Sequence, residues 1–382
     1  MNHERTASLG ELALQLKTHL AAFATPAVPL PSDAELDALL EAAFYASLYE
    51  EEGRRLSFGI AWQPEPRECA AVVAIGGAVR VTPGNLAKLA PALAGEATTI
   101  AVRPERGELM AWALFGAGTQ QPLTVRVLGP GQLRIDYAGV ARALYARGEI
   151  LMYGGEHRVE SPVQRLAKTF APWTGDESVL RAAVIGRLSA LALAHGHGGM
   201  ILIVPAGTDT PVGVRVHYGV GDGASMLAQR YANVLRDVPP GERLARLVGA
   251  RPRNLDGRAL VRDEAQIAYA EALESVARLT AIDNALLLDT DLRVRGFGVQ
   301  VIEGDAPHNE FRHTNPYSGD VHTDDLATFK GTRHPAGVIF CMRQPREAAA
   351  VIASQDGNLS LAVKDATGVE VVGSYIRGFG WK

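Results

Sequence analysis

Four consecutive residues combine side chains suited to holding a polyphosphate. Gly331-Thr332-Arg333-His334 places a small residue, a hydroxyl, a guanidinium and an imidazole in a row. Guanidinium groups bind phosphate oxygens through charged hydrogen bonds, and successive backbone N–H groups beside a glycine can add anion contacts. The segment follows an apolar strand pattern, and we expect it to form a loop.

A second group of polar residues lies at the ends of predicted strands. Asp283-Asn284-Ala285 opens one strand, where a carboxylate can bind a metal ion or accept a proton, and Ser354 ends another. These segments are far apart in sequence, but adjacent strands would bring them together. The combination predicts a nucleotide-binding site.

The elements that must position these residues begin with an N-terminal α+β region. Residues 1–60 show helical patterns, and Ser32-Asp33-Ala34-Glu35 has the spacing of a capping box. Short β-type runs bounded by Gly and Pro follow over residues 67–136, interrupted by a short helix that starts near Thr82. We expect a smaller α+β domain with an antiparallel sheet over residues 1–165.

The second half alternates between helical and strand patterns. We expect helices over 177–194 and 266–280, and buried strands over 200–204 and 284–288. A polar, Gly- and Pro-rich excursion occupies about 206–265. This order predicts a mixed α/β fold over 177–375, with a mixed sheet flanked by helices. The turn-rich residues 151–176 are the expected domain boundary.

Composition limits the classes of function. The chain has 382 residues, of which 47% are hydrophobic, so it can bury sizeable cores. Its formal net charge of −4 argues against a protein that coats nucleic acid through bulk charge. No apolar stretch is long enough to cross a bilayer, and the N-terminus shows no signal-peptide pattern. Two cysteines, Cys69 and Cys341, give no disulfide framework. We expect a cytoplasmic protein with no membrane or nucleic-acid partner.

Four motifs in order resemble the diadenylate cyclase domain of the bacterial cyclic-di-AMP synthases. The glycine-led strand at Gly198–Ile203 resembles the first. Asp283-Asn284-Ala285 resembles the Asp-Gly-Ala motif, and Gly331–Pro335 resembles Gly-Thr-Arg-His-Arg. The strand ending at Ser354, with acidic Asp356 after it, resembles the last. The N-terminal part is similar to the sensor-type domain called DACNV, which is found ahead of divergent cyclase-like domains.

The resemblance implies a reaction and a set of residue roles. Two ATP molecules would condense to cyclic-di-AMP with release of two pyrophosphates, using Mg²⁺ or Mn²⁺. Asp283 would lie near the 3′-hydroxyl and the metal, and two protomers would have to face each other because one domain binds one ATP. The nucleotide and its phosphates would be held by Asn284, Ala285, Gly331, Thr332, Arg333, His334 and Ser354.

Two departures from the family pattern leave alternative functions open. Pro335 stands where the family has a second arginine and supplies no donor, and Asn284 stands where it has glycine. Asn tolerates the left-handed backbone conformation that a glycine can occupy, so this conformation can be kept. The added side chain reduces the space for the nucleotide. Arg343 and Arg346 follow shortly and are candidates to replace the missing charge. The readings are an active cyclase, a nucleotide sensor or effector without turnover, a scaffold that assembles on nucleotide, and a polar turn with no ligand.

Single residues also have structural interpretations. Asp283 can be a strand cap and Ser354 an ordinary strand-end hydroxyl. Asp222-Gly223-Ala224 repeats the family tripeptide outside the expected context and is interpreted as a turn. A His- and Asp-rich loop over 308–325 can hold zinc or manganese, act as a lid, or be a solvated loop. His195 and His197 end a helix, where a cationic side chain suits the helix dipole.

Overall fold

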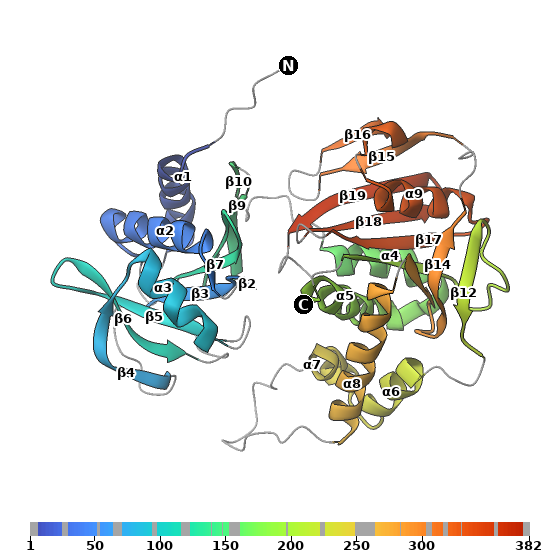
Figure 1. Ribbon diagram of the computed structural model, residues 1–382, viewed down its shortest axis with the longest axis horizontal. Coiled ribbons are helices and arrows are strands. Elements are labelled where there is room, and N and C mark those ends of the chain that lie inside the picture. The colour runs from blue at the N-terminus through green and yellow to red at the C-terminus, as the bar shows by residue number, and fades with distance from the viewer. Residues whose placement is uncertain are drawn as a thin grey trace. The chain divides into compact units, whose positions relative to one another are not determined.

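A computed structural model shows two compact units, residues 1–158 and residues 159–382, each with its own core (Figure 1). Each unit is described by itself. The structure describes residues 7–24, 30–51, 54–63, 71–93, 98–115, 123–138, 140–146, 148–152, 161–195, 198–221, 226–248, 264–282, 284–302, 308–315, 320–329, 331–354 and 358–376.

The first unit is built on an eight-stranded sheet of order β10-β9-β8-β7-β3-β5-β6-β4. Most neighbours are antiparallel, but the central pair β3 and β5 is parallel, so the sheet is mixed rather than the antiparallel sheet expected. A parallel pair needs a long crossover, and β4 with helix α3 provides it. The strands are β3 (Phe58–Trp62), β4 (Ala71–Arg80), β5 (Thr99–Glu105), β6 (Glu108–Phe115), β7 (Leu123–Gly129), β8 (Gln132–Tyr137), β9 (Val140–Ala146) and β10 (Glu149–Met152), with β1 (Glu50–Glu51) and β2 (Arg54–Arg55) forming a separate pair.

Three helices complete the first core: α1 (Leu9–Ala21), α2 (Asp33–Ser47) and α3 (Pro83–Leu89). Ser32 and Glu35 form the predicted capping box of α2, because each side chain accepts a hydrogen bond from the other residue's backbone N–H. Helix α3 starts after Thr82, as expected. The prediction of helical structure up to residue 60 was wrong for its last part, since residues 58–62 form a fully buried strand.

The second unit contains a nine-stranded mixed sheet of order β12-β14-β13-β11-β17-β18-β19-β15-β16. Its centre pairs β11 with β13 in parallel and with β17 in antiparallel orientation, and all three strands are buried. The strands are β11 (Gly199–Val204), β12 (Val214–Gly219), β13 (Ala285–Asp289), β14 (Val294–Val301), β15 (Glu310–Thr314), β16 (Val321–Asp325), β17 (Ala348–Ala353), β18 (Asn358–Asp365) and β19 (Gly368–Ile376).

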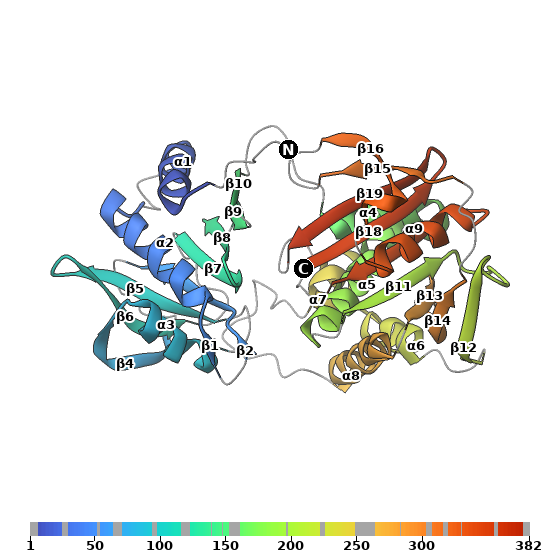
Figure 2. The same cartoon turned by 45° about the horizontal axis from the view of Figure 1, so that its top comes forward.

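Helices cover both faces of this sheet (Figures 1 and 2). Alternate strand residues such as Leu202 and Ile352 pack against helix α9 (Arg333–Arg343), while their neighbours such as Ile201 and Val351 pack on the opposite helical layer. The second layer contains α4 (Pro162–Thr174), α5 (Ser178–Ala194), α6 (Met226–Val234), α7 (Arg243–Val248) and α8 (Glu264–Arg278). This arrangement confirms the predicted mixed α/β fold class.

Two segments of the second unit differ from their sequence patterns. Helix α4 occupies residues that the sequence assigns to a turn-rich junction, and its buried Leu166 and Phe170 join the second core. The His- and Asp-rich segment is a hairpin of β15 and β16, paired to β19, rather than a loop. Among the described helices, none is both long enough and apolar enough to cross a membrane.

Candidate functional site

The central strands bring two of the predicted site residues to one edge of the second sheet. Met200 pairs with Ala285 and Gly199 pairs with Ala353, so β11 and β13 begin where β17 ends. Asn284 and Ser354, which come directly before β13 and after β17, therefore lie at this same edge. They are separated by two strand spacings, or about 10 Å.

Helix α9 starts at this edge too. The Nε2 atom of His334 lies 3.0 Å from the Oγ atom of Ser360, which pairs with Ile352 near the end of β17. One turn later, a Cβ atom added to Gly337 would lie 3.0 Å from the Cδ1 atom of Ile352. The helix then runs toward the opposite edge, where Lys364, paired with Ala348, donates to the carbonyl of Met342. Thr332 and Arg333 are thus placed at the edge that holds Ser354.

The motif Gly331–His334 is therefore a helix start rather than a closed loop. Gly331, Thr332 and Arg333 are exposed, and no atom lies within 4 Å of a Cβ placed on Gly331. The hydroxyl of Thr332, at the N-cap position, makes no capping hydrogen bond. The first-turn N–H groups are left without a side-chain cap, and such groups favour an anion.

His334 has a more buried position than its neighbours in the motif. Its ring stacks on Phe329 with centroids 5.3 Å apart, and it is half-buried. Desolvation, followed by the charge of His313, lowers the pKa of His334. The imidazole is therefore neutral at neutral pH, and it anchors the start of α9 on the sheet through Ser360.

The two departures from the family pattern have structural consequences. Asn284 has a φ of 82°, which is the left-handed conformation expected for an asparagine that replaces glycine. Pro335 is the third residue of α9, where a proline is accommodated because the helix makes no bond to that N–H. It also removes one N–H group that would otherwise face an anion.

Arg343 and Arg346 lie at the far end of α9 from Arg333. Arg343 is the last residue of α9, and its Nη1 atom donates to the carbonyl of Ile302 at 2.7 Å. Arg346 follows the helix at the same end. The carbonyl of Ile302 follows β14, which is three strands away from β17 and Ser354 in the sheet.

Other predicted positions have defined surroundings. Ala285 is fully buried in the core beneath α9, so its side chain packs and only its backbone is near the edge. His195, after α5, lies 3.0 Å from Glu274 of α8, which supports its structural role. Asp283, His197 and the Asp222-Gly223-Ala224 turn lie outside the described residues.

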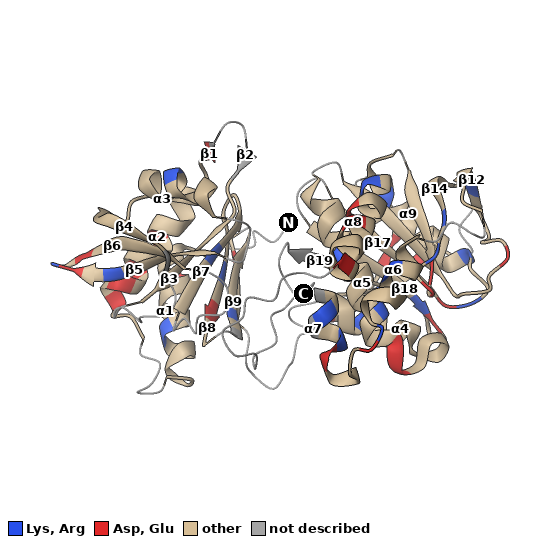
Figure 3. Cartoon of the chain, turned by 90° about the horizontal axis from the view of Figure 1, so that it is seen from below, with Lys and Arg blue, Asp and Glu red and all other residues tan. Residues whose placement is uncertain are grey.

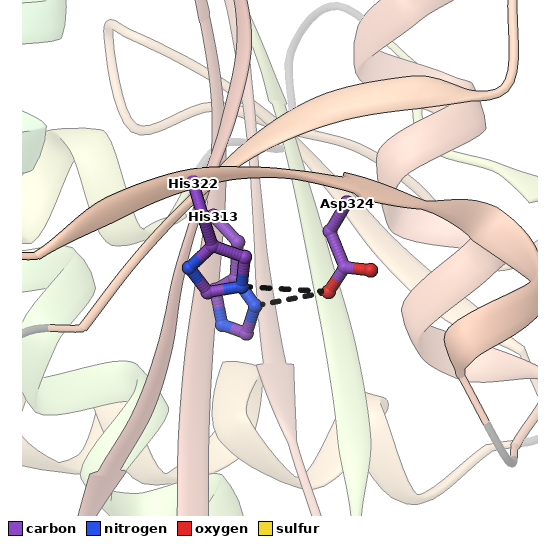
Figure 4. A group of neighbouring side chains, drawn as sticks. All are labelled: His313, His322 and Asp324. Atoms are coloured by element: carbon purple, nitrogen blue, oxygen red, sulfur yellow. Dashed lines mark hydrogen bonds and ion pairs between the residues drawn. The ribbon is translucent and has the colours of Figure 1, made fainter.

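The hairpin brings together three residues of the His- and Asp-rich segment for which the sequence allows a zinc or manganese site. His313, His322 and Asp324 offer ligand atoms that all lie within 4.8 Å of one another (Figure 4). The sequence indicates only that His322 and Asp324, two residues apart, would point to the same side of a strand. The pairing of His313 with His322 is known from the structure alone. This cluster lies beside the start of α9, because Phe311 of the hairpin stacks on Phe329, which in turn stacks on His334 of α9.

The first unit contains an open hollow of about 460 Å³, lined by Tyr45, Leu48, Tyr49 and Pro83. The three residues from the end of α2 and the segment after it are each about half exposed. An exposed apolar surface of this kind on a folded domain is a candidate binding surface.

Comparison with known families gives one assignment, and it concerns this first unit. Residues 25–115 match the probable sensor domain DACNV. The DACNV match contains all four residues that line the hollow. It confirms the sensor-type domain expected in the N-terminal half. Searches of the curated proteins and of the solved structures return no match.

Proposed function

We propose that this chain is a two-unit signalling protein in which a DACNV sensor unit precedes a nucleotide-binding unit of the diadenylate cyclase type. The observation that carries the proposal is that Asn284, Ser354 and the uncapped start of α9 lie at the same edge of the second sheet. Polar side chains from three elements and free backbone N–H groups at one edge suit a nucleotide triphosphate.

Each residue at the edge has a proposed role. Arg333, exposed at the first position of α9, pairs with phosphate oxygens, and Thr332 and Ser354 donate hydroxyl hydrogen bonds. Asn284 faces the nucleoside side of the site. His334 acts through Ser360 as a positioning residue, since its Nε2 atom is already engaged and its ring is neutral.

The proposed reaction is the condensation of two ATP molecules. The 3′-oxygen of each forms a bond to the α-phosphorus of the other, the bond from that phosphorus to the bridging oxygen breaks, and pyrophosphate leaves. The hydroxyl proton passes to the carboxylate of Asp283. Because each unit holds one ATP, two copies of the chain must face each other to close the ring.

Mg²⁺ or Mn²⁺ would be held through the carboxylate of Asp283, the residue before Asn284 in the sequence. The amide oxygen of Asn284 would add a ligand of the type that Mg²⁺ takes together with substrate phosphates. When bound, such an ion would neutralise charge on the triphosphate. The residues of the chain orient the nucleotide and accept the proton.

A second candidate function is a nucleotide sensor or effector that binds without turnover. Pro335 and Asn284 favour it, because the first removes a donor from the helix start and the second adds a side chain at the edge. Binding of a nucleotide would be retained through Arg333 and the remaining N–H groups.

The test is incubation of purified full-length protein with ATP and Mg²⁺ or Mn²⁺, followed by chromatography of the products. Formation of cyclic-di-AMP that is lost in Asp283→Asn and kept in Arg346→Ala supports the cyclase. Saturable ATP binding without product supports the sensor. If the protein forms no product and does not bind ATP, the shared edge is not a nucleotide site.

A further inference from the structure

We propose that His313, His322 and Asp324 form a binding site for a divalent transition-metal ion of the Zn²⁺ type on the β15–β16 hairpin. Strand pairing explains why the three side chains share one face. His313 lies directly opposite His322, and Asp324 lies opposite Phe311, two residues along each strand. Side chains two residues apart on a strand point to the same side of the sheet.

The ligand atoms have the spacing of a tetrahedral site. The Nδ1 atom of His313 lies 3.3 Å from the Oδ2 atom of Asp324, and the Nε2 atom of His322 lies 3.9 Å from the same oxygen (Figure 4). Zinc bonds of about 2.0–2.1 Å at tetrahedral angles put neighbouring ligand atoms roughly 3.3 Å apart. His322 has a side chain that is 60% exposed, so it is free to close the remaining gap.

A metal-free ion-pair cluster explains the geometry less well. Both imidazoles approach one carboxylate oxygen, at distances longer than the ~2.7–2.9 Å of a charged hydrogen bond. The other carboxylate oxygen of Asp324, Oδ1, accepts a hydrogen bond from the backbone N–H of Asp325 at 2.9 Å. The Oδ2 atom of Asp324 is left facing the two imidazoles.

The protein also leaves room for His313 in this orientation. A Cβ atom on Gly373 of β19 would lie 3.3 Å from the Nε2 atom of His313 and 3.6 Å from the Oγ atom of Ser360. The ring nitrogen not used for metal binding therefore points into the space above Gly373, beside a hydroxyl. A hydrogen-bond partner at the second nitrogen is the usual support for a metal-binding histidine. Ser360 is itself held by His334.

The ligand set defines the class of metal. Two imidazoles and one carboxylate suit Zn²⁺ and related first-row ions, whereas Mg²⁺ and Ca²⁺ prefer oxygen ligands throughout. Three protein ligands leave a fourth position open on the solvent side of His322. An open position is the mark of a site that binds water or a further ligand, rather than a closed structural site.

The experiment is a Zn²⁺ titration of tag-free, chelator-treated full-length protein by calorimetry, with Co²⁺ absorption as a spectroscopic check of the ligand geometry. We expect one site per chain. His322→Ala and Asp324→Asn should each weaken binding at least about ten-fold, because removing even a residue that hydrogen-bonds to a metal ligand costs that much. Excess Mg²⁺ should not displace the ion.

His308→Ala is the matched control, since this exposed histidine precedes the same hairpin and lies outside the cluster. It should bind Zn²⁺ as the unmodified chain does. Because Asp324→Asn keeps the shape of the side chain, it tests the site even if the alanine variant folds poorly. Absence of a stoichiometric site, equal affinity in the ligand variants, or an equal loss in His308→Ala would overturn the proposal.

Discussion

Arg333 and His334 are adjacent in sequence but have different environments. Arg333 is exposed at the start of α9, whereas His334 is half-buried against Phe329 and bound to Ser360. A helix of 3.6 residues per turn points successive side chains about 100° apart, so one faces solvent while the next packs on the sheet. The motif therefore divides into a residue that can bind phosphate and a residue that holds the helix in place.

Removing the guanidinium of Arg333 is expected to weaken ATP binding. Arg333→Ala should cost ~1.5–3 kcal/mol, the usual value of a charged hydrogen bond, or roughly 10- to 150-fold in dissociation constant. Calorimetric titration with ATP in the presence of a divalent ion measures this. Arg346→Ala, an exposed arginine beyond the far end of α9, serves as the control and should bind as before. Equal affinities for both variants would remove the helix start from the nucleotide site.

Acidification is expected to lower the free energy of unfolding through His334. Its pKa in the folded chain lies below the ordinary value of 6.5, so the unfolded chain takes up the proton more readily. The contribution to stability is fully present above pH 6.5 and is lost as the pH falls through the folded pKa.

Urea unfolding at a series of pH values measures how steeply the free energy of unfolding changes with pH. His334→Gln, which cannot be protonated, should make the dependence shallower below pH 6.5. His217→Gln on the exposed edge strand β12 is the control and should leave it unchanged. An unaltered slope in His334→Gln would mean that the imidazole is not desolvated as described.

At the scale of elements, α9 and the β15–β16 hairpin form one polar and aromatic assembly on a single face of the sheet. Phe311 stacks on Phe329 at 5.2 Å, and Phe329 stacks on His334 at 5.3 Å. The charge of His313 reaches His334 closely enough to shift its pKa. The hairpin, the helix start and β18 are therefore physically coupled, and a metal ion on the hairpin would lie beside the proposed phosphate site.

Close contact between α9 and β17 depends on Gly337. A Cβ atom there would lie 3.0 Å from the Cδ1 atom of Ile352 and 3.2 Å from the Cβ atom of Ala350, so Gly337→Ala requires these neighbours to shift by a few tenths of an ångström. Overpacking of this kind typically costs ~1–3 kcal/mol of unfolding free energy. Denaturant unfolding measures the loss. Gly241→Ala has open space around its Cβ and should change stability little. Similar stabilities of the two variants would contradict the tight packing of α9.

At the scale of the whole molecule, the chain is two separately cored units with an overall charge of −4. Positive and negative residues are interspersed along the described elements of each unit in the view of Figure 3. The overall charge is small for a chain of this length, so it gives no sign of binding through bulk charge. The match to the probable sensor domain DACNV, over residues 25–115, lies within the first unit.

If ring closure needs two facing copies, catalysis must depend on protein concentration. The specific activity of cyclic-di-AMP formation is expected to fall on dilution, because the paired state dissociates by mass action. Product formation measured over a dilution series, together with the molecular mass by light scattering, tests this. A specific activity that stays constant while the protein is a monomer would contradict the need for two copies.

Local patterns in the sequence determined the elements whose signals are local. The capping box at Ser32, the helix over residues 178–194 and the buried strands β11, β13 and β17 were all predicted, because capping residues and runs of apolar side chains act within a few positions. The mixed α/β class followed from their order. Helix α4, placed among turn signals, and β3, placed among helical ones, were missed because distant packing decides them.

Only the tertiary structure decided which polar residues meet. Register between β15 and β16 brings His313 beside His322 and Asp324, and no spacing along the chain shows that register. The direction of α9 across the sheet puts Arg333 at the edge with Ser354 and carries Arg343 to Ile302 after β14, three strands away from β17. Both results depend on burying a continuous apolar face between helix and sheet, a free energy that belongs to contacts between distant segments rather than to any one of them.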